Sequence, residues 1–287
     1  MSKKPRKPAS SLKIPKIILI TGKVLSIISS KLVTLFVAKL FTTPIKYKIP
    51  KREHEMDAKS RQENLFIPAI QKAVVVYHLG ESPKKVLLVH GWSGRGTQLV
   101  KFADELLKAG YSTISFDAPA HGKSPGKTTL MPEFIATILH IQNLYGPFDA
   151  AIGHSLGGMS LLNASRQGLM LKRLATIGSG DIVQDIIDDF VAKLELNPKI
   201  SDKMRLHFEK ENDKTMDSFS AYLSAKEIDI PVLVVHDNDD DEVPVKCGIH
   251  IHKHLKNGEL MITKGLGHRK ILGDKAVIDK VLQFIKN

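Results

Sequence analysis

Residues 148–159 of the 287-residue chain read FDAAIGHSLGGM and carry its strongest structural signal. The apolar run at residues 150–152 predicts a buried strand, and residues 159–166 are compatible with a helix. Ser155 lies between them in the pattern G-x-S-x-G. A strand that turns at once into a helix strains its apex residue and leaves that side chain exposed at the end of the sheet. The stretch therefore predicts a nucleophilic serine beside a helix N-terminus, whose free N–H groups favour negative charge.

Small residues flank this serine on both sides. A strand and a helix joined so tightly leave no room for bulk two positions before and two positions after the apex, and Gly153 and Gly157 meet that need. The same pattern also occurs in ordinary glycine-rich turns. A catalytic interpretation therefore requires a base and an acid later in the chain.

Strand and helix patterns alternate on both sides of the turn, which predicts βαβ units and an α/β fold. We expect a mostly parallel central sheet flanked by helices. The further predicted strands are residues 45–49, 73–78, 85–90, 111–116, 174–178, 232–236 and 259–262, and the further predicted helices are residues 98–108, 132–144 and 276–285. Residues 51–66 read as loop or helix. The alternation breaks at Gly180, and residues 181–228 predict a helical insertion between the sixth and seventh strands.

The cysteine content and the apolar content bound the class of protein. The hydrophobic fraction is 43%, enough for a sizeable core. Cys247 is the one cysteine, so an internal disulfide is impossible, which fits a reducing compartment such as the cytoplasm.

The net charge of +12 is concentrated at the N-terminus. Residues 1–52 hold 13 Lys or Arg and no Asp or Glu, so the rest of the chain holds 42 − 13 = 29 basic residues against 30 acidic ones. A nucleic-acid enzyme would more often spread its basic residues over the folded surface. The distribution therefore argues against nucleic acid as a partner.

Residues 16–41 predict a loosely amphipathic helix, and residues 1–10 predict disorder. Lysines interrupt the helix so often that the longest uncharged runs are seven residues, which disfavours a transmembrane span and a cleavable signal peptide. Two alternatives remain: a helix on an anionic membrane surface, or a helix packed on the domain. The apolar side of the wheel is Ile17, Val24, Ile28, Leu32 and Leu35.

Polar loops follow both of the last two predicted strands. Residues 237–242 read DNDDDE, and the loop after residues 259–262 ends at His268. Functional groups in parallel sheets lie in loops at the carboxyl ends of strands. The order serine, carboxylate, histidine thus appears in three such loops, as nucleophilic catalysis by serine requires.

From about residue 45 to the C-terminus, the chain resembles members of the α/β-hydrolase superfamily. The motifs that carry the resemblance are His90-Gly91-Trp92, DAPAHGKS at residues 117–124, GHSLG at residues 153–157, DDEVP at residues 240–244, and Gly267-His268. The resemblance implies a hydrolase domain at residues 45–287, with a helical lid at about residues 181–228 over the serine. A basic arm at residues 1–44 would precede it.

The resemblance also implies roles for the site residues. Ser155 would be the nucleophile, and His268 would be the general base and then the acid. Asp240 would orient the histidine, because the superfamily acid commonly stands three residues before a Val-Pro pair. Asp239 and Asp241 stay open as alternatives in this acidic loop.

The oxyanion hole implied by the resemblance uses the backbone N–H groups of Trp92 and Leu156. Trp92 and Arg95 stand where a substrate could touch them, although Arg95 can equally be a solvated loop residue. His121 is expected to support the site, and His154 is expected to point away from the nucleophile. The sequence contains no cofactor-binding or metal-binding motif.

These observations predict a serine hydrolase that cleaves a small-molecule carboxylic ester or thioester through an acyl-enzyme. An acyltransferase using the same three residues is the alternative, followed by a non-catalytic binding protein on the same fold. The predicted location is cytoplasmic. It would be peripheral at the inner membrane surface if residues 1–43 bind anionic lipid.

Overall fold

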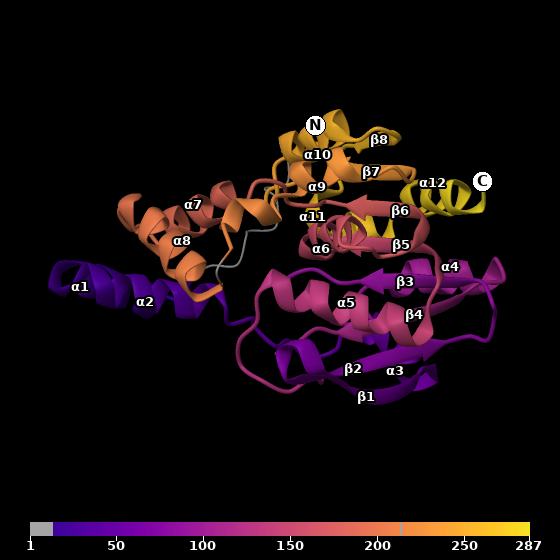
Figure 1. Ribbon diagram of the computed structural model, residues 1–287, viewed down its shortest axis with the longest axis horizontal. Coiled ribbons are helices and arrows are strands. Elements are labelled where there is room, and N and C mark those ends of the chain that lie inside the picture. Colours follow the sequence, from indigo (N-terminus) through magenta and orange to yellow (C-terminus); the bar gives the residue numbers. More distant parts are fainter. Residues whose placement is uncertain (1–13, 213) are drawn as a thin grey trace, which may run out of the picture.

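The computed structural model describes residues 14–212 and 214–287, and at its centre these residues form an eight-stranded sheet (Figure 1). The strands are β1 (Arg61–Ile67), β2 (Lys72–Leu79), β3 (Lys85–Val89), β4 (Ser112–Asp117), β5 (Phe148–His154), β6 (Leu171–Ile177), β7 (Val232–Asp237) and β8 (Gly258–Thr263). Their spatial order is β1-β2-β4-β3-β5-β6-β7-β8. The pairs β1–β2 and β2–β4 are antiparallel, and the other neighbours are parallel. The predicted α/β fold with a mostly parallel sheet is confirmed.

Helices cover both faces of the sheet. Successive strand residues point to opposite sides, and the central strands carry apolar residues on both, so each face is buried by a layer of helices. Leu87 and Val89 belong to the core shared with α5 (Met131–Tyr145), α6 (Leu156–Arg166), α9 (Ala221–Glu227) and α10 (Val245–His254). Val86 and Leu88 belong to the core shared with α4 (Val100–Lys108) and α12 (Lys275–Lys286). Short helices complete this second layer: η1 (Lys51–Glu53), α3 (His54–Lys59), α11 (Gly267–Lys270) and η4 (Ile271–Gly273), while η2 (Pro68–Ile70) joins β1 to β2.

The first strand was misplaced by the sequence prediction. Residues 45–49 form no strand, and Ile45 is 53% exposed. Instead β1 lies within residues 51–66 and one residue beyond, in the segment predicted as loop or helix. This strand lies at the edge of the sheet, and Ile67 is its one fully buried side chain. An edge strand needs little apolar alternation, because its hydrogen bonds to β2 place it.

The basic N-terminal segment forms two helices rather than one. They are α1 (Lys16–Ile28) and α2 (Ser30–Phe41), separated by Ser29 in an extended conformation. The Ser29 hydroxyl accepts a hydrogen bond from the backbone N–H of Leu32, which caps α2. Residues 1–10, predicted to be disordered, lie outside the described residues. Among the described residues, no helix combines the length and the apolar character that crossing a membrane requires.

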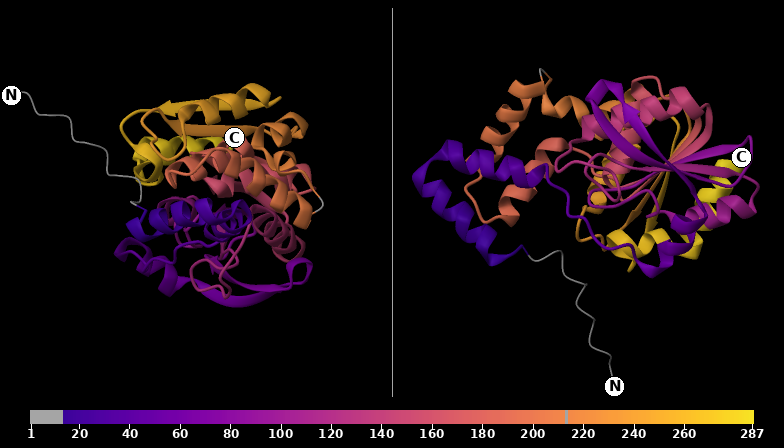
Figure 2. Two further views of the ribbon diagram at one scale, coloured as in Figure 1. Left: turned by 90° about the vertical axis from the view of Figure 1, so that its left-hand side faces the viewer. Right: turned by 90° about the horizontal axis from the view of Figure 1, so that it is seen from below.

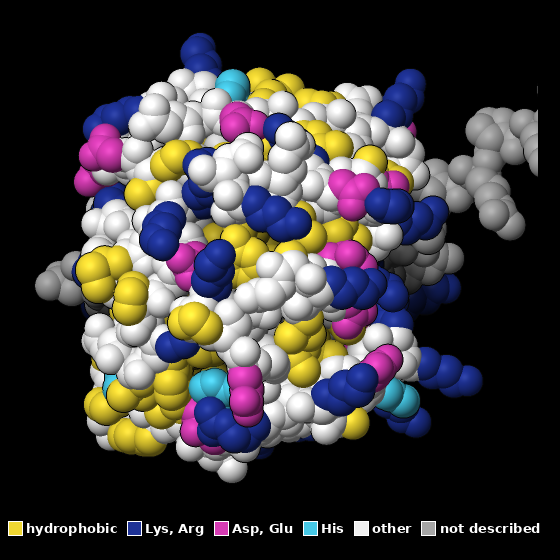
Figure 3. Space-filling model, turned by 90° about the vertical axis from the view of Figure 1, so that its right-hand side faces the viewer, with side chains coloured by type: hydrophobic (Ala, Val, Ile, Leu, Met, Phe, Trp, Pro, Cys, Tyr) yellow, Lys and Arg dark blue, Asp and Glu magenta, His cyan; other side chains and the backbone are white. Residues whose placement is uncertain are grey.

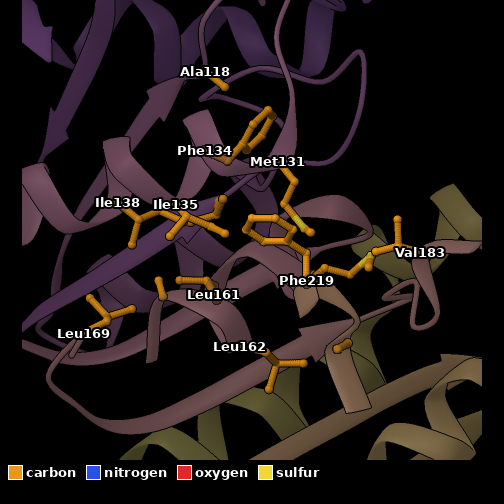
Figure 4. Packing of buried hydrophobic residues seen from close by; sticks show 14 of the residues in the cluster. Ala118, Met131, Phe134, Ile135, Ile138, Leu161, Leu162, Leu169, Val183 and Phe219 are labelled. Atoms are coloured by element: carbon orange, nitrogen blue, oxygen red, sulfur yellow. The ribbon is translucent and has the colours of Figure 1, made fainter. Parts of the chain in front are cut away.

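Four helical elements connect β6 to β7, in the segment where a helical insertion is expected. They are α7 (Val183–Lys193), α8 (Lys199–Asn212), η3 (Met216–Phe219) and the sheet-covering α9. Val183 and Phe219 reach Met131 and Phe134 of α5 in a common buried cluster (Figure 4). The helices α1 and α2 lie beside α7 and α8, and together they form a lobe that projects from one end of the sheet (Figures 1 and 2).

Candidate active site

Ser155 forms the apex of a strained turn between β5 and α6. Its backbone has φ 52° and ψ −120°, a conformation that is uncommon for a residue with a side chain. A Cβ at Gly153 would lie 2.6 Å from the Gly157 carbonyl oxygen, and a Cβ at Gly157 would lie 2.3 Å from the Val89 carbonyl oxygen. The expectation that both flanking positions must be small is confirmed, because backbone fills the space on each side.

Asp240 and His268 are joined by a hydrogen bond at the ends of β7 and β8. His268 Nδ1 donates to Asp240 Oδ2 over 2.7 Å. The other carboxylate oxygen, Oδ1, accepts from the backbone N–H groups of Glu242 at 2.9 Å and Val243 at 2.8 Å. The structure thus brings Asp240, and neither Asp239 nor Asp241, to the histidine.

The environment of Asp240 favours its charged form. Burial on its own would raise the pKa, but the hydrogen bond and the charge of His268 outweigh it, with further help from the two backbone donors. The net result is a lowered pKa. The carboxylate therefore stays ionised at neutral pH and holds the Nδ1 proton of His268.

Two glycines allow loops to lie directly against the site residues: Gly91 against Ser155, and Gly178 against His268 and Asp240. A Cβ at Gly91 would lie 2.9 Å from Ser155 Cβ, so the loop after β3 lies directly against the serine. A Cβ at Gly178, after β6, would lie 3.3 Å from His268 Nδ1 and 3.4 Å from Asp240 Oδ2. Within residues 14–212 and 214–287, Ser155 Oγ forms no hydrogen bond. Catalytic hydrogen bonds often tighten only when substrate is bound.

Two buried histidines hold the loop that carries Trp92. His90 Nε2 accepts from the Ala118 N–H at 3.0 Å, and His121 Nε2 accepts from the Ser93 N–H at 3.0 Å. Burial lowers the pKa of His90 well below its usual value and that of His121 to about 4. Both rings are therefore neutral. His121 has the supporting position that the sequence led us to expect.

The backbone N–H groups of Trp92 and Leu156 face no protein acceptor in the described part of the chain. Leu156 is the first residue of α6, where helix geometry leaves the N–H without an intrahelical partner. The Trp92 side chain is 37% exposed and stacks edge-to-face on His121, with ring centroids 5.3 Å apart. Both N–H groups are thus available to a ligand.

Arg95 has a different environment from either of the two expected. Its side chain is buried rather than solvated. Its Nε lies 3.6 Å from Glu53 Oε2, and Thr97 donates a hydrogen bond to the same oxygen at 2.8 Å. The positive charge of Arg95 is thus paired with Glu53 inside the protein. We therefore remove Arg95 from the residues expected to contact substrate.

Asp237 is a site residue that the sequence analysis overlooked. Its carboxylate accepts hydrogen bonds from the Asp239 and Gly267 N–H groups, both at 2.9 Å, from the Leu266 N–H at 3.1 Å and from the Thr263 hydroxyl at 2.6 Å. It thereby ties the loop of Asp240 to the loop of His268. As the last residue of β7, Asp237 lies where functional groups of parallel sheets are expected. The acidic residues that follow it made it hard to single out from the sequence.

His154 lies beneath His268. Its Nε2 donates to the His268 carbonyl oxygen at 2.9 Å, and the two rings are 4.6 Å apart. Burial and the nearby His268 lower the pKa of His154 to about 3, so the ring is neutral. Its Nδ1 has no hydrogen-bond partner among the described residues. The His154 ring thus helps to position His268 by a hydrogen bond to the backbone of His268.

The described residues offer no cluster of three or more His, Cys, Asp or Glu side chains suited to a metal ion. The site instead combines a serine on the turn after β5 with an Asp–His pair at the ends of β7 and β8, which neighbour each other in the sheet. On a mostly parallel eight-stranded sheet, this arrangement is that of the α/β-hydrolase fold.

The chain belongs to the α/β-hydrolase family, whose model matches residues 86–273. Solved structures with the same fold include a putative lipase from Acinetobacter baumannii. Its TM-score is 0.62 and its identity is 21%, and the match covers 84% of this chain and 97% of that one. An esterase from Exiguobacterium antarcticum has TM-score 0.63 and 16% identity, covering 79% and 100%. A bromoperoxidase from Bacillus anthracis has TM-score 0.62 and 16% identity, covering 79% and 100%. The search of curated proteins found no match. Membership of the family supports a hydrolase activity.

Proposed function

We propose that the protein is a serine hydrolase that cleaves a carboxylic ester or thioester through an acyl-enzyme. The observation that carries the proposal is the 2.7 Å hydrogen bond from His268 Nδ1 to Asp240, at the same edge of the sheet as the strained Ser155 turn. This bond leaves His268 Nε2 as the basic nitrogen. A nucleophile after β5, an orienting acid after β7 and a base after β8 are thus available at the carboxyl ends of the strands, with β6 between β5 and β7.

In the proposed first half-reaction, Ser155 Oγ attacks the carbonyl carbon of the substrate while His268 Nε2 takes its proton. The carbonyl oxygen becomes negative and is held by the N–H groups of Trp92 and Leu156, each worth about 3–4 kcal/mol in comparable sites. His268 then gives its proton to the departing alcohol or thiol. Asp240 stabilises the positive imidazolium throughout and stays ionised.

In the second half-reaction, water replaces the leaving group. His268 removes a proton from the water, the resulting hydroxide attacks the acyl carbon, and Ser155 leaves with the proton returned by His268. An alcohol or amine acceptor in place of water would make the protein an acyltransferase. Products formed with added acceptors distinguish the two outcomes, since a transferase would shift its products away from the free acid.

Labelling with a fluorophosphonate probe tests the proposal directly. The wild-type protein should be labelled and should hydrolyse p-nitrophenyl esters, whereas Ser155→Ala should do neither while keeping its fold. A matched control is Ser165→Ala, which alters a serine in the same helix α6 away from the turn. Labelling or turnover that survives in Ser155→Ala would refute the assignment of the nucleophile.

A further inference from the structure

The outer face of α1 exposes a row of large apolar side chains. We call this row the α1 stripe, and it consists of Ile17, Ile20, Val24, Ile27 and Ile28, whose exposure ranges from 48% to 86%. The spacing of three and four residues places them on one side of the helix. Contiguous exposed apolar surface of this kind marks an interaction site more often than chance.

Packing within the protein does not explain the stripe, because other residues of the two helices carry that packing. Gly22 faces Leu196 of the insertion so closely that a Cβ there would touch it at 3.4 Å. Val33 and Val37 of α2 are fully buried, and the Phe41 ring meets Phe190 with centroids 5.2 Å apart. The predicted packing on the domain is thus observed for one face of the segment, and the other face is left exposed.

Charge around the stripe identifies the kind of partner. Residues 14–52 contain no Asp or Glu. Among the described residues, Lys16, Lys31 and Lys39 of the same two helices form no ion pair, whereas Lys23 pairs with Glu195. A second copy of the chain would bring equal basic surfaces face to face, which costs free energy. An anionic bilayer accepts apolar side chains and attracts lysines at its surface.

The position of the two helices relates the stripe to the candidate active site. The helices α1 and α2 lie beyond the end of the sheet toward which β3, β5 and β6 point (Figure 1). Ser155 directly follows β5 at this same end. The opposite end of the molecule shows Lys and Arg interspersed with Asp, Glu and apolar side chains (Figure 3). A bilayer bound through the stripe would thus lie at the catalytic end.

We propose that the α1 stripe inserts into the interfacial layer of an anionic bilayer and that the substrate is an ester or thioester whose acyl chain resides in that bilayer. The substrate part rests on the proposed hydrolase function, and the docking part does not. Docking supplies the substrate at a high effective concentration without any new contact at Ser155.

Sedimentation with vesicles tests the docking. The wild-type protein should bind vesicles of phosphatidylcholine mixed with phosphatidylglycerol, bind phosphatidylcholine alone more weakly, and be released by salt. The double variant Ile20→Glu/Ile27→Glu should bind at least about tenfold more weakly, since two inserted side chains become charged. The control Ile249→Glu makes the same change at an exposed isoleucine of α10 and should bind like the wild type.

Hydrolysis assays test the substrate class on the same three proteins. All of them should cleave a soluble p-nitrophenyl ester equally, which also shows that the variants are folded. For an ester embedded in the anionic vesicles, the double variant should lose at least about tenfold in rate, as its binding does. Equal rates on the embedded ester would overturn the substrate part of the proposal.

Three results would overturn the docking part: no binding of wild-type protein to anionic vesicles, undiminished binding by the double variant, or a wild-type dimer in solution that the double variant lacks. The last result would make a second copy the occupant. Failure of the hydrolase proposal is recognised separately, because Ser155→Ala would then keep its turnover while vesicle binding followed the stripe as expected.

Discussion

At the level of single residues, two nearby aspartates have different roles: Asp237 is the last residue of β7, and Asp240 lies in the loop that follows. Asp240 contacts His268 itself, whereas Asp237 accepts four hydrogen bonds that join the two loops carrying the pair. Their pKa values are both lowered, although burial opposes this, because donors surround each carboxylate. Losing Asp237 should therefore displace the pair without removing it.

We predict that Asp237→Asn lowers kcat roughly ten- to a hundredfold while KM changes little, because a displaced histidine affects the reaction more than binding. An amide places a donor where the carboxylate now accepts, so one of the loop contacts must break. Steady-state kinetics on a p-nitrophenyl ester measures the effect. Asp241→Asn is the matched control, and an equal loss of kcat in that variant would contradict the prediction.

We predict that Gly157→Ala destabilises the protein or prevents its folding, because the new Cβ would meet the Val89 carbonyl oxygen at 2.3 Å. Backbone at this distance cannot yield as a flexible side chain does, and overpacking of this kind costs about 1–3 kcal/mol or more. Urea unfolding measures the loss. Gly273→Ala, where a Cβ has open space, should leave the unfolding midpoint unchanged.

At the scale of elements, the N-terminal helices and the insertion stabilise each other. The Phe41 ring of α2 lies against Phe190 of α7 and Phe208 of α8, with centroids 5.2 and 6.0 Å apart. Removing residues 1–43 as a whole would delete Phe41 and expose Phe190, Phe208 and the part of the insertion that they belong to. Point changes on the α1 stripe therefore test membrane binding more cleanly than a truncation.

We predict that Phe41→Ala costs about 1–3 kcal/mol of unfolding free energy, less than a fully buried phenylalanine, because Phe41 is half-buried. The loss should be local, with faster hydrogen exchange in α2, α7 and α8 than in the sheet. Exchange measured by mass spectrometry tests this. Phe66→Ala, an exposed phenylalanine of β1, should leave exchange in those helices unchanged; uniform loosening of the whole chain would count against the prediction.

For the whole molecule, stability should depend on pH through buried neutral histidines. The pKa of His121 is lowered from 6.5 to about 4, and that of His154 to about 3, mainly by burial. Below pH 6.5 the unfolded chain gains protons that the folded protein cannot accept. Each such group therefore contributes stability above its unfolded pKa and loses it progressively as the pH falls toward the folded pKa.

We predict that the free energy of unfolding falls steadily between about pH 6.5 and pH 4, with His121 alone accounting for on the order of 3 kcal/mol. Urea midpoints measured across this range test the slope. His121→Gln keeps an acceptor for the Ser93 N–H and should flatten the dependence, whereas His54→Gln, at an exposed position, should not. A slope identical in both variants would show that other groups dominate.

The sequence by itself determined the features that depend on residues close together in the chain. The strand–helix turn at Ser155 was predictable because the steric demands on Gly153 and Gly157 come from neighbours a few residues away. Strands β2 to β8 were predictable for the same reason, since side-chain periodicity is a local property, whereas β1 and the division between α1 and α2 were not. The motifs also indicated Ser155, Asp240 and His268 as the candidate site.

Contacts between distant segments decided the rest. The edge strand β1 formed where β2 could pair with it, although its own residues show little alternation. Arg95 is buried because Glu53, far away in the sequence, lies opposite it. The division of residues 16–41 into a packed face and an exposed face depends on where the insertion lies. In each case the free energy comes from burial or pairing against a partner that periodicity and spacing do not identify.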